Sequence, residues 1–128
     1  HIIKAEEALD TLTTSKSRDW KLTAAYYAIY HSIYSLLMKL GIKCEIHSCT
    51  IEFVKRFLTN HFSTEDFELI DKAFLARIDS QYYVNRKVPD KNYDLILKHT
   101  PIFLVKCKNI ILEERDIIKI RKEIRSVK

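Results

Sequence analysis

At 128 residues the chain is long enough for one domain, and a chain of this size buries about two-thirds of its unfolded surface, so it needs no disulfide or metal to fold. Hydrophobic residues make up 47% and charged residues 30%, a balance that excludes a disordered chain. The net charge of +5 permits contact with an anion such as RNA without requiring it, because basic and acidic residues are both spread along the sequence.

The cysteine count and the absence of targeting patterns indicate a cellular setting. Three cysteines are an odd number, which argues against a disulfide framework and favours a reducing cytoplasm. The sequence has no secretory signal pattern and no apolar run of about 18 residues. We therefore expect a cytoplasmic protein that does not associate with a membrane.

Apolar residues recur at helical spacing, and alternating strand-like stretches are absent, so the sequence predicts an all-α protein. The first helix is expected to span Ile3 to about Leu12. The second is expected to run from Arg18 to Leu40 and to stop at Gly41, because glycine readily adopts the left-handed conformation that ends helices.

The second predicted helix is apolar over most of its circumference, so we expect it to be the central helix of a bundle or to contribute to a dimer interface. One stripe along it repeats every seven residues. Its members are Trp20, Ala24, Tyr27, His31, Tyr34 and Met38.

Two further helices are predicted in the middle of the chain. The third covers residues 48–58, with the serine at position 48 as its cap. The fourth begins at Ser63 or Thr64, either of which can cap it, and ends near Tyr82 or Tyr83.

The last third of the chain is predicted as a loop followed by helix. Residues 85–92 are polar and contain a proline, so they are expected to form the loop. The segment from Tyr93 to about Ser126 has helical spacing, and Pro101 is expected to kink or divide it, with Thr100 capping the second part. The predicted architecture is one domain, an all-α bundle of four to six helices.

Several blocks of sequence, in a consistent order and spacing, carry a resemblance to a known family. They are Lys4-Ala5-Glu6-Glu7-Ala8-Leu9, Ala25-Tyr26-Tyr27-Ala28-Ile29-Tyr30-His31, Leu36-Leu37-Met38-Lys39-Leu40-Gly41, His47, and Arg77 followed by Gln81-Tyr82. Together they resemble the HEPN (higher eukaryotes and prokaryotes nucleotide-binding) family over nearly the whole chain. The small, single-domain prokaryotic members are the most similar.

The resemblance implies an up-and-down helical bundle, often a homodimer, that is commonly encoded beside a minimal nucleotidyltransferase as a toxin–antitoxin pair. Active members are metal-independent ribonucleases with an Arg-x4-6-His motif near the end of a helix, and two copies of the motif meet across the dimer interface. In this chain Arg77 matches the arginine, but Tyr82, Tyr83 and Val84 stand where the histidine would be. The chain thus resembles the branch that lacks the histidine.

Three functions remain open from these residues. The leading interpretation is an RNA- or nucleotide-associated accessory module that acts with a nucleotidyltransferase partner, its cleavage activity weakened or lost. The second is an active ribonuclease toxin that uses Arg77 as the cation beside the phosphate together with Tyr82 or Tyr83, although a phenol with a pKa of about 10 is a poor base. The third is a purely structural interaction domain. The residues expected to bind nucleic acid or a nucleotide are Arg77, Gln81, Tyr82, Arg86 and Lys87.

Arg77 and His31 each have a structural interpretation as well. Arg77 could satisfy helix carbonyls or pair with Asp79 or Glu68. His31 could be a core or interface histidine that bonds a tyrosine hydroxyl or a carbonyl, or it could replace the missing motif histidine by packing near Arg77.

Metal and cofactor sites are weakly supported. Cys44, His47 and Cys49 form a Cys-x2-His-x-Cys pattern, but a structural zinc site needs four ligands, and Cys107 or His61 would have to come from elsewhere. The single glycine excludes a glycine-rich phosphate loop. We therefore expect neither a metal nor a cofactor.

Overall fold

The computed structural model describes residues 2–43, 47–82 and 88–126. For residues 47, 48, 79–82 and 126 it describes the backbone and not the side chain. Within these ranges the chain forms helices and no strand, which confirms the predicted all-α bundle. The described helices are α1 (Ile2–Thr14), α2 (Arg18–Leu40), α3 (His47–Phe57), α4 (Thr64–Tyr82), α5 (Asp90–Asn109) and α6 (Glu114–Ser126).

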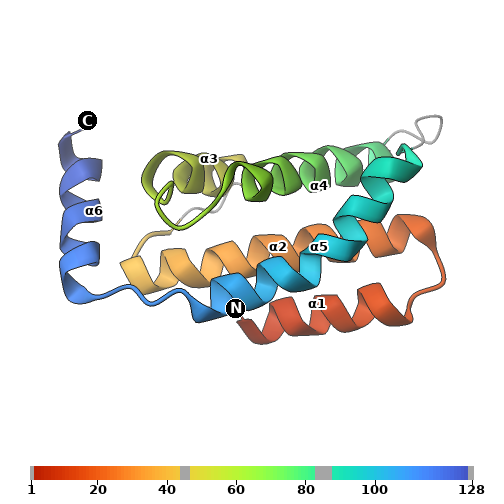
Figure 1. The fold of residues 1–128 in the computed structure, drawn as a ribbon, viewed down its shortest axis with the longest axis horizontal. Coiled ribbons are helices and arrows are strands. Elements are labelled where there is room, and N and C mark those ends of the chain that lie inside the picture. Colours follow the sequence, from red (N-terminus) through yellow and green to blue (C-terminus); the bar gives the residue numbers. More distant parts are fainter. Residues whose placement is uncertain (1, 44–46, 83–87, 127–128) are drawn as a thin grey trace.

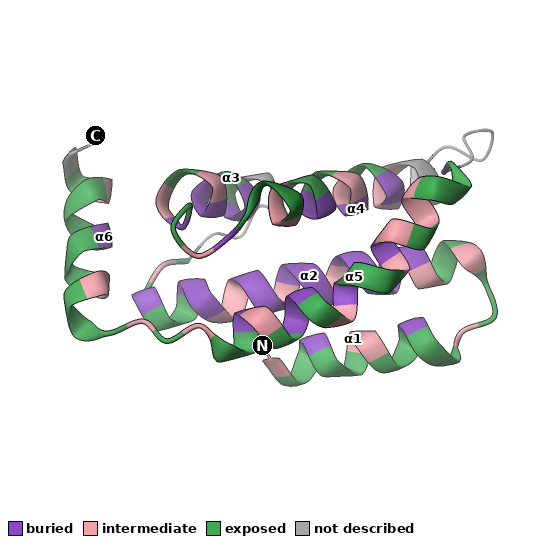
Figure 2. Ribbon diagram, viewed as in Figure 1, coloured by how far each residue is buried: buried purple, intermediate pink, exposed green. Residues whose placement is uncertain are grey.

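Helix α2 lies at the centre of the bundle. In Figure 1, α1 lies along one side of it, α3 and α4 follow one another along the other side, and α5 crosses in front. The contacts agree, because α2 packs against α1, α3, α4 and α5. Figure 2 shows that the buried residues concentrate on α2 and on the surfaces of α4 and α5. Helix α6 stands across one end of the bundle and is exposed along most of its length (Figures 1 and 2).

The boundaries of α2 coincide with the predicted ones because both ends of the helix are capped, the start by a side chain and the end by backbone hydrogen bonds. At the start, the Ser17 hydroxyl accepts a hydrogen bond from the Trp20 backbone N–H (3.4 Å). At the end, Gly41 adopts a φ of 72°, and its N–H donates to the Met38 carbonyl (3.1 Å) while the Ile42 N–H donates to Leu37 (3.0 Å). This is the left-handed termination that the glycine predicted.

The predicted ends of α1 and α3 are less accurate. Helix α1 starts one residue earlier and ends two residues later than the predicted Ile3–Leu12. Helix α3 begins at His47, so Ser48 lies inside it and the prediction that Ser48 is its cap is wrong. Helix ends commonly differ from pattern-based predictions by one or two residues, because apolar spacing does not define the terminal turn.

The start of α4 is capped by Ser63, one of the two residues predicted to cap it, and the cap is reciprocal. The Asp66 carboxylate accepts from the Ser63 backbone N–H (2.9 Å), and the Ser63 hydroxyl accepts from the Asp66 N–H (3.3 Å). Lys106 of α5 also donates to the Asp66 carboxylate, which joins the two helices. Burial alone would raise the pKa of Asp66, but the hydrogen bonds from Lys106 and Ser63 outweigh it and hold the pKa below its ordinary value of 3.8.

Helix α5 corrects the predictions for the last third of the chain. It begins at Asp90, inside the predicted loop, and it continues as one helix through Pro101, so the predicted division there is wrong. The Thr100 hydroxyl donates to the Ile96 carbonyl (2.6 Å) within the same helix and caps nothing. A proline in a helix interior costs about 3 kcal/mol, whereas burying Phe103 or Leu104 stabilises by roughly 1.5–3 kcal/mol each. The buried side chains beyond Pro101 therefore offset its cost.

The helical segment divides later, between α5 and α6. Ile110 is extended, and the Glu113 N–H donates to the Asp116 carboxylate (3.2 Å), which caps the start of α6. The Arg121 guanidinium then reaches back and donates to the Leu40 carbonyl from Nε (3.0 Å) and Nη2 (2.9 Å). A Cβ at Gly41 would lie 2.5 Å from that Nη2 atom, so glycine also leaves room for this contact.

No helix within the described ranges combines the length and the apolar character that a bilayer span needs.

The cap at the start of α4 predicts a pH-dependent contribution to stability. Asp66→Ala removes both the cap and the ion pair with Lys106, and we expect it to lower the free energy of unfolding by about 1–2 kcal/mol. Because folding depresses the pKa of Asp66, this stabilisation is present above pH 3.8 and is lost as the pH falls further. Urea unfolding at pH 7 and at pH 3 measures the difference.

The matched control is Asp71→Ala, which removes a more exposed ion pair with Lys55 (2.5 Å) and no cap. Equal unfolding free energies for Asp66→Ala and Asp71→Ala at neutral pH would contradict the prediction.

Candidate functional site

Arg77 lies on the face of α4 that packs against α2. It follows the buried Ile70 by seven residues and Phe74 by three, a spacing that places all three on one side of the helix. Its side chain is neither fully buried nor fully exposed. The position of Arg77 on α4 thus directs its cationic side chain toward the aromatic residues of α2.

The Arg77 guanidinium rests on two tyrosine rings. Its Cζ atom lies 5.0 Å from the centre of the Tyr26 ring and 5.6 Å from that of Tyr27. Its Nε is buried and has no hydrogen-bond partner, and within the described part of the chain no carboxylate forms an ion pair with it. Glu68, a predicted partner, pairs with Lys72 instead (2.7 Å), so that prediction is wrong; the side chain of Asp79 lies outside the described residues.

The rings beneath Arg77 are neutral, so its charge is not cancelled there. Tyr26 is 1% exposed, and burial raises the pKa of its hydroxyl, even though the Arg77 charge acts in the opposite direction. Tyr26 therefore stays protonated and cannot act as a base near neutral pH. A guanidinium that rests on neutral ring faces can still donate N–H hydrogen bonds in its own plane to the oxygens of an anion such as phosphate.

His31 lies one helical turn beyond Tyr27 on α2. Its ring stacks on Tyr27 with centroids 6.2 Å apart and meets Tyr30 edge-on at 5.3 Å. Tyr27 is therefore in ring contact with both Arg77 and His31. These rings belong to a series of aromatic contacts along α2, some stacked and others tilted or edge-on, whose members are Tyr26, Tyr27, Tyr30, His31 and Tyr34.

The predicted stripe of α2, which repeats every seven residues, is only partly covered by other helices. Its two ends are open, since Trp20 is 64% exposed and Met38 is 50% exposed, while Tyr27, His31 and Tyr34 between them are half-buried. The stripe is thus an aromatic edge of the core that reaches the surface beside Arg77.

A pocket of about 190 Å³ opens where this edge meets α1. None of the residues that line it is charged: they are Ala8, Thr11, Trp20, Thr23, Ala24 and Tyr27. Tyr27 lines the pocket and also lies under Arg77. We call this hollow the Trp20 pocket.

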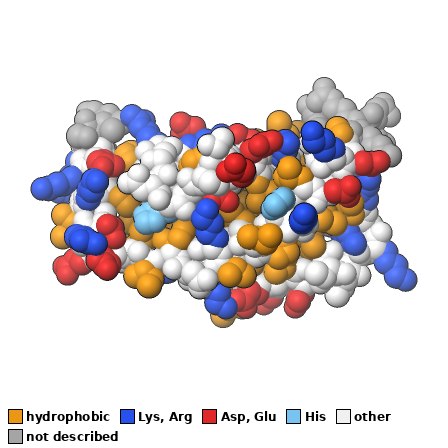
Figure 3. Space-filling model, viewed as in Figure 1, with side chains coloured by type: hydrophobic (Ala, Val, Ile, Leu, Met, Phe, Trp, Pro, Cys, Tyr) orange, Lys and Arg blue, Asp and Glu red, His pale blue; other side chains and the backbone are white. Residues whose placement is uncertain are grey.

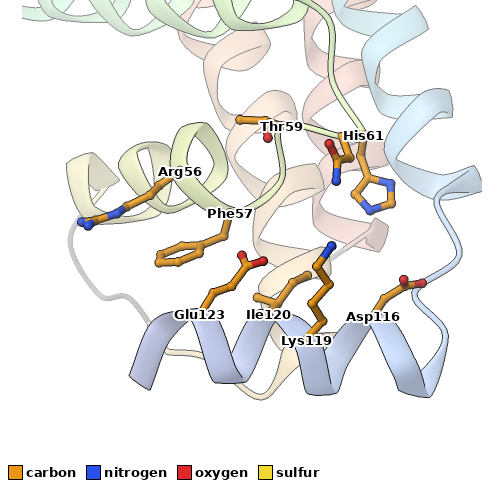
Figure 4. Close-up of a pocket in the computed structure, with 9 residues that line it drawn as sticks. Arg56, Phe57, Thr59, His61, Asp116, Lys119, Ile120 and Glu123 are labelled. Carbon is orange, nitrogen blue, oxygen red and sulfur yellow. The ribbon is translucent and has the colours of Figure 1, made fainter. Parts of the chain in front are cut away.

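A second pocket, of about 130 Å³, lies between α6 and the end of α3 with the turn that follows (Figure 4). Asp116, Lys119 and Glu123 line it from α6, opposite Phe57 and His61, and Arg56 extends outward from α3. Its lining carries two basic side chains, Arg56 and Lys119, and two acidic ones, Asp116 and Glu123, so it does not select for either sign. Figure 3 likewise shows basic and acidic side chains interspersed on the face that carries α5.

The other predicted site residues stand in the sequence at the end of α4 or after it. Gln81 and Tyr82 form its last turn, with side chains outside the described residues, and Tyr83, Arg86 and Lys87 lie outside them altogether.

The described chain resumes at Val88, where Arg18 of α2 holds it. Arg18 donates to the Val88 carbonyl (2.6 Å) and to Asp90 (2.8 Å), and its guanidinium lies 4.2 Å from the centre of the Tyr93 ring.

Of the weak metal candidates, Cys44 and the side chain of His47 lie outside the described residues, and Cys49 is exposed. Cys107, considered as a fourth ligand, is buried in the core, and burial raises the pKa of its thiol, which disfavours the thiolate that zinc requires. Among the described residues, no group of three or more potential ligands is placed to hold a metal ion.

Sequence reasoning located Arg77 but missed its partners. The contact of Arg77 with Tyr26 and Tyr27 depends on the relative rotation of α2 and α4, which neither helix encodes alone. The exposure of Trp20 was also missed. The only signal for it was its place at the end of the stripe, in the first turn of α2, where fewer neighbours can cover it.

The central aromatic helix, the helices packed around it and an arginine near the end of α4 define a small all-α domain of the HEPN class. Residues 2–124 match the HEPN domain family, and the chain therefore belongs to that family.

Two archaeal proteins are similar along most of their length. "Putative toxin MJ0142" of Methanocaldococcus jannaschii is 28% identical over 118 residues, which cover 91% of this chain and 80% of the relative. A "UPF0332 protein" of Archaeoglobus fulgidus is 29% identical over 94 residues, or 73% of this chain and 75% of the relative.

Proposed function

We propose that this chain is a toxin-type HEPN module that binds RNA or a nucleotide through Arg77, with its own cleavage activity weakened or lost. One observation carries the proposal: a half-buried guanidinium that has ring faces beneath it and no anionic partner in the described structure. Removing a cation from water is costly unless an anion or a ligand compensates. A phosphate group is a ligand that matches the planar guanidinium.

The toxin assignment is supported by the family and by the relative from Methanocaldococcus, whose name describes it as a toxin. Weakened cleavage is supported by the residues that follow Arg77. Metal-free RNA cleavage needs a group that exchanges protons near neutral pH, which histidine does and tyrosine does not. The positions where the family motif has histidine are occupied here by Tyr82, Tyr83 and Val84.

RNA binding and its salt dependence test the role of Arg77. We expect Arg77→Met to weaken binding of a short single-stranded RNA by roughly ten- to a hundredfold, because a charge-assisted contact to a phosphate is lost. The slope of log K against log salt should decrease by about 0.7, the value for one phosphate contact on a single strand. Fluorescence anisotropy across a salt series measures both quantities.

The matched control is Arg115→Met, whose side chain is 81% exposed and pairs only with Glu113 in the described structure. It should change affinity less than twofold. Arg77→Met should stay folded, with the free energy of unfolding within about 1 kcal/mol of wild type, because a cation–π contact at a partly exposed site contributes about that much. Unchanged RNA affinity in a folded Arg77→Met protein would refute the proposal and favour the structural interaction domain.

A second candidate function, an active ribonuclease, is favoured by the position of His31. Its ring is one tyrosine away from Arg77, so a histidine from α2 could exchange protons in place of the motif histidine. Under the leading proposal, a labelled mixed-sequence RNA in EDTA should stay intact with the wild-type protein. Gel-resolved cleavage that falls by about 10²–10⁴-fold in both His31→Asn and Arg77→Met would support the ribonuclease instead. His99→Asn, at an exposed histidine of α5, is the control.

We further propose that the module forms a homodimer through the Met38 end of the α2 stripe and acts with a minimal nucleotidyltransferase protein. Met38 is half-exposed, with the aromatic Tyr34 one turn before it, and an apolar helix edge of this kind favours a partner surface.

A nucleotidyltransferase partner is supported only by the resemblance to small prokaryotic HEPN proteins. Its co-purification with the chain would test it.

The homodimer predicts a mass of two chains in solution. Met38→Glu should give a mass of one chain, because it places a charge in the apolar contact. Ile118→Glu alters a residue of equal exposure (51%) on α6 and should leave the mass unchanged. Sedimentation equilibrium of the three proteins decides; a wild-type mass of one chain at micromolar concentration would exclude the dimer.

A further inference from the structure

We infer that the Trp20 pocket binds one unpaired base of the RNA whose phosphate contacts Arg77. The inference rests on the proposed function and extends it, because it assigns a base-binding subsite to the end of the α2 stripe and specifies single-stranded RNA as the ligand.

The pocket has the walls and floor that a flat aromatic ligand requires. Trp20 and Tyr27 are seven residues apart on α2, so their Cα atoms lie about 10 Å apart along the axis. Small residues, Ala8 and Ala24, line the space with them, and its volume is about 190 Å³. Stacking on an aromatic ring is how proteins hold unpaired bases without reading their sequence.

The backbone of Trp20 is held in place although its side chain is exposed. It lies in the first turn of α2, where the Ser17 hydroxyl accepts from its backbone N–H (3.4 Å). With 64% of its surface in water, the indole contributes little to the core. A large exposed aromatic side chain on a rigid, capped helix turn is typical of a contact site.

The charge distribution favours a nucleotide over an apolar protein side chain. No charged residue lines the pocket, whereas a guanidinium lies 5.6 Å from the centre of the Tyr27 ring, which is also part of the pocket wall. An apolar hollow and a cation that share one tyrosine match the two parts of a nucleotide, its base and its phosphate. An apolar side chain would fill the hollow but would leave Arg77 without an anion.

The chain contains a single tryptophan, so tryptophan fluorescence, excited selectively over the tyrosines, reports on Trp20 alone. The first experiment titrates the wild-type protein with a short mixed-sequence single-stranded RNA and with the same sugar–phosphate backbone lacking its bases. We expect the RNA to quench the tryptophan fluorescence and the abasic strand to bind more weakly without quenching.

Two variants then test the pocket by different routes, with affinity measured by anisotropy. Trp20→Ala removes a stacking wall, and Ala8→Leu fills the space from α1 with a good helix former. Each should weaken RNA binding by roughly five- to a hundredfold and leave the affinity for the abasic strand unchanged. Trp20→Phe keeps a flat ring and should retain most of the binding. Ile111→Ala, at a residue that is 79% exposed, is the control.

The outcomes separate this inference from the proposed function. If Trp20→Ala and Ala8→Leu bind RNA as the wild type does while Arg77→Met does not, the base subsite is wrong and the phosphate site stands. If Trp20→Ala also halves the mass in solution, the pocket is a contact with a second copy of the chain and the base subsite is wrong. If the wild-type protein binds neither strand, both proposals fail.

Discussion

The burial of α2 on most of its surface determines where the other helices lie. A helix that is apolar around most of its circumference must be covered, and α1, α3, α4 and α5 each pack against it. The coverage is incomplete along one edge, from Trp20 to Met38. Because that edge is formed by the aromatic stripe of α2, it presents rings to the surface, where an ordinary exposed helix face would present charges. The candidate site is therefore the part of the core helix that the bundle leaves open.

Arg77 illustrates what this arrangement permits. A half-buried guanidinium usually pairs with a carboxylate, and that pair would weaken its affinity for any other anion. Here the ring faces of Tyr26 and Tyr27 support it through cation–π contacts of about 0.5–2 kcal/mol and leave its charge uncancelled. The net charge of +5 is carried by basic side chains that are interspersed with acidic ones, so the proposed attraction for a phosphate is local to this side chain and does not depend on a broad basic surface.

The helices were predictable where the capping residues and the apolar spacing of a segment indicated the same boundaries. Helix α2 had a capping serine, a long apolar pattern and a terminal glycine, and its boundaries were predicted to the residue. Helix α5 is not divided at Pro101, the alternative to a kink that the sequence predicted, because the local cost of proline is visible in the sequence and the compensating burial of Phe103 is not. The same distinction applies to the site. The sequence singled out Arg77 as a site residue, but its contact with two tyrosines required the packing of two helices.

The contact between Arg121 and the end of α2 has a consequence for the order in which the domain is completed during synthesis. Leu40 and Arg121 are 81 residues apart in the chain. At 5–20 residues per second a ribosome needs about 4–16 seconds to cover that distance. During this interval the end of α2 has only the backbone hydrogen bonds around Gly41, and water must satisfy the Leu40 carbonyl. Gly41 thus ends α2 with backbone hydrogen bonds that the nascent chain can form by itself. Arg121 adds its hydrogen bonds to the Leu40 carbonyl once α6 has been translated.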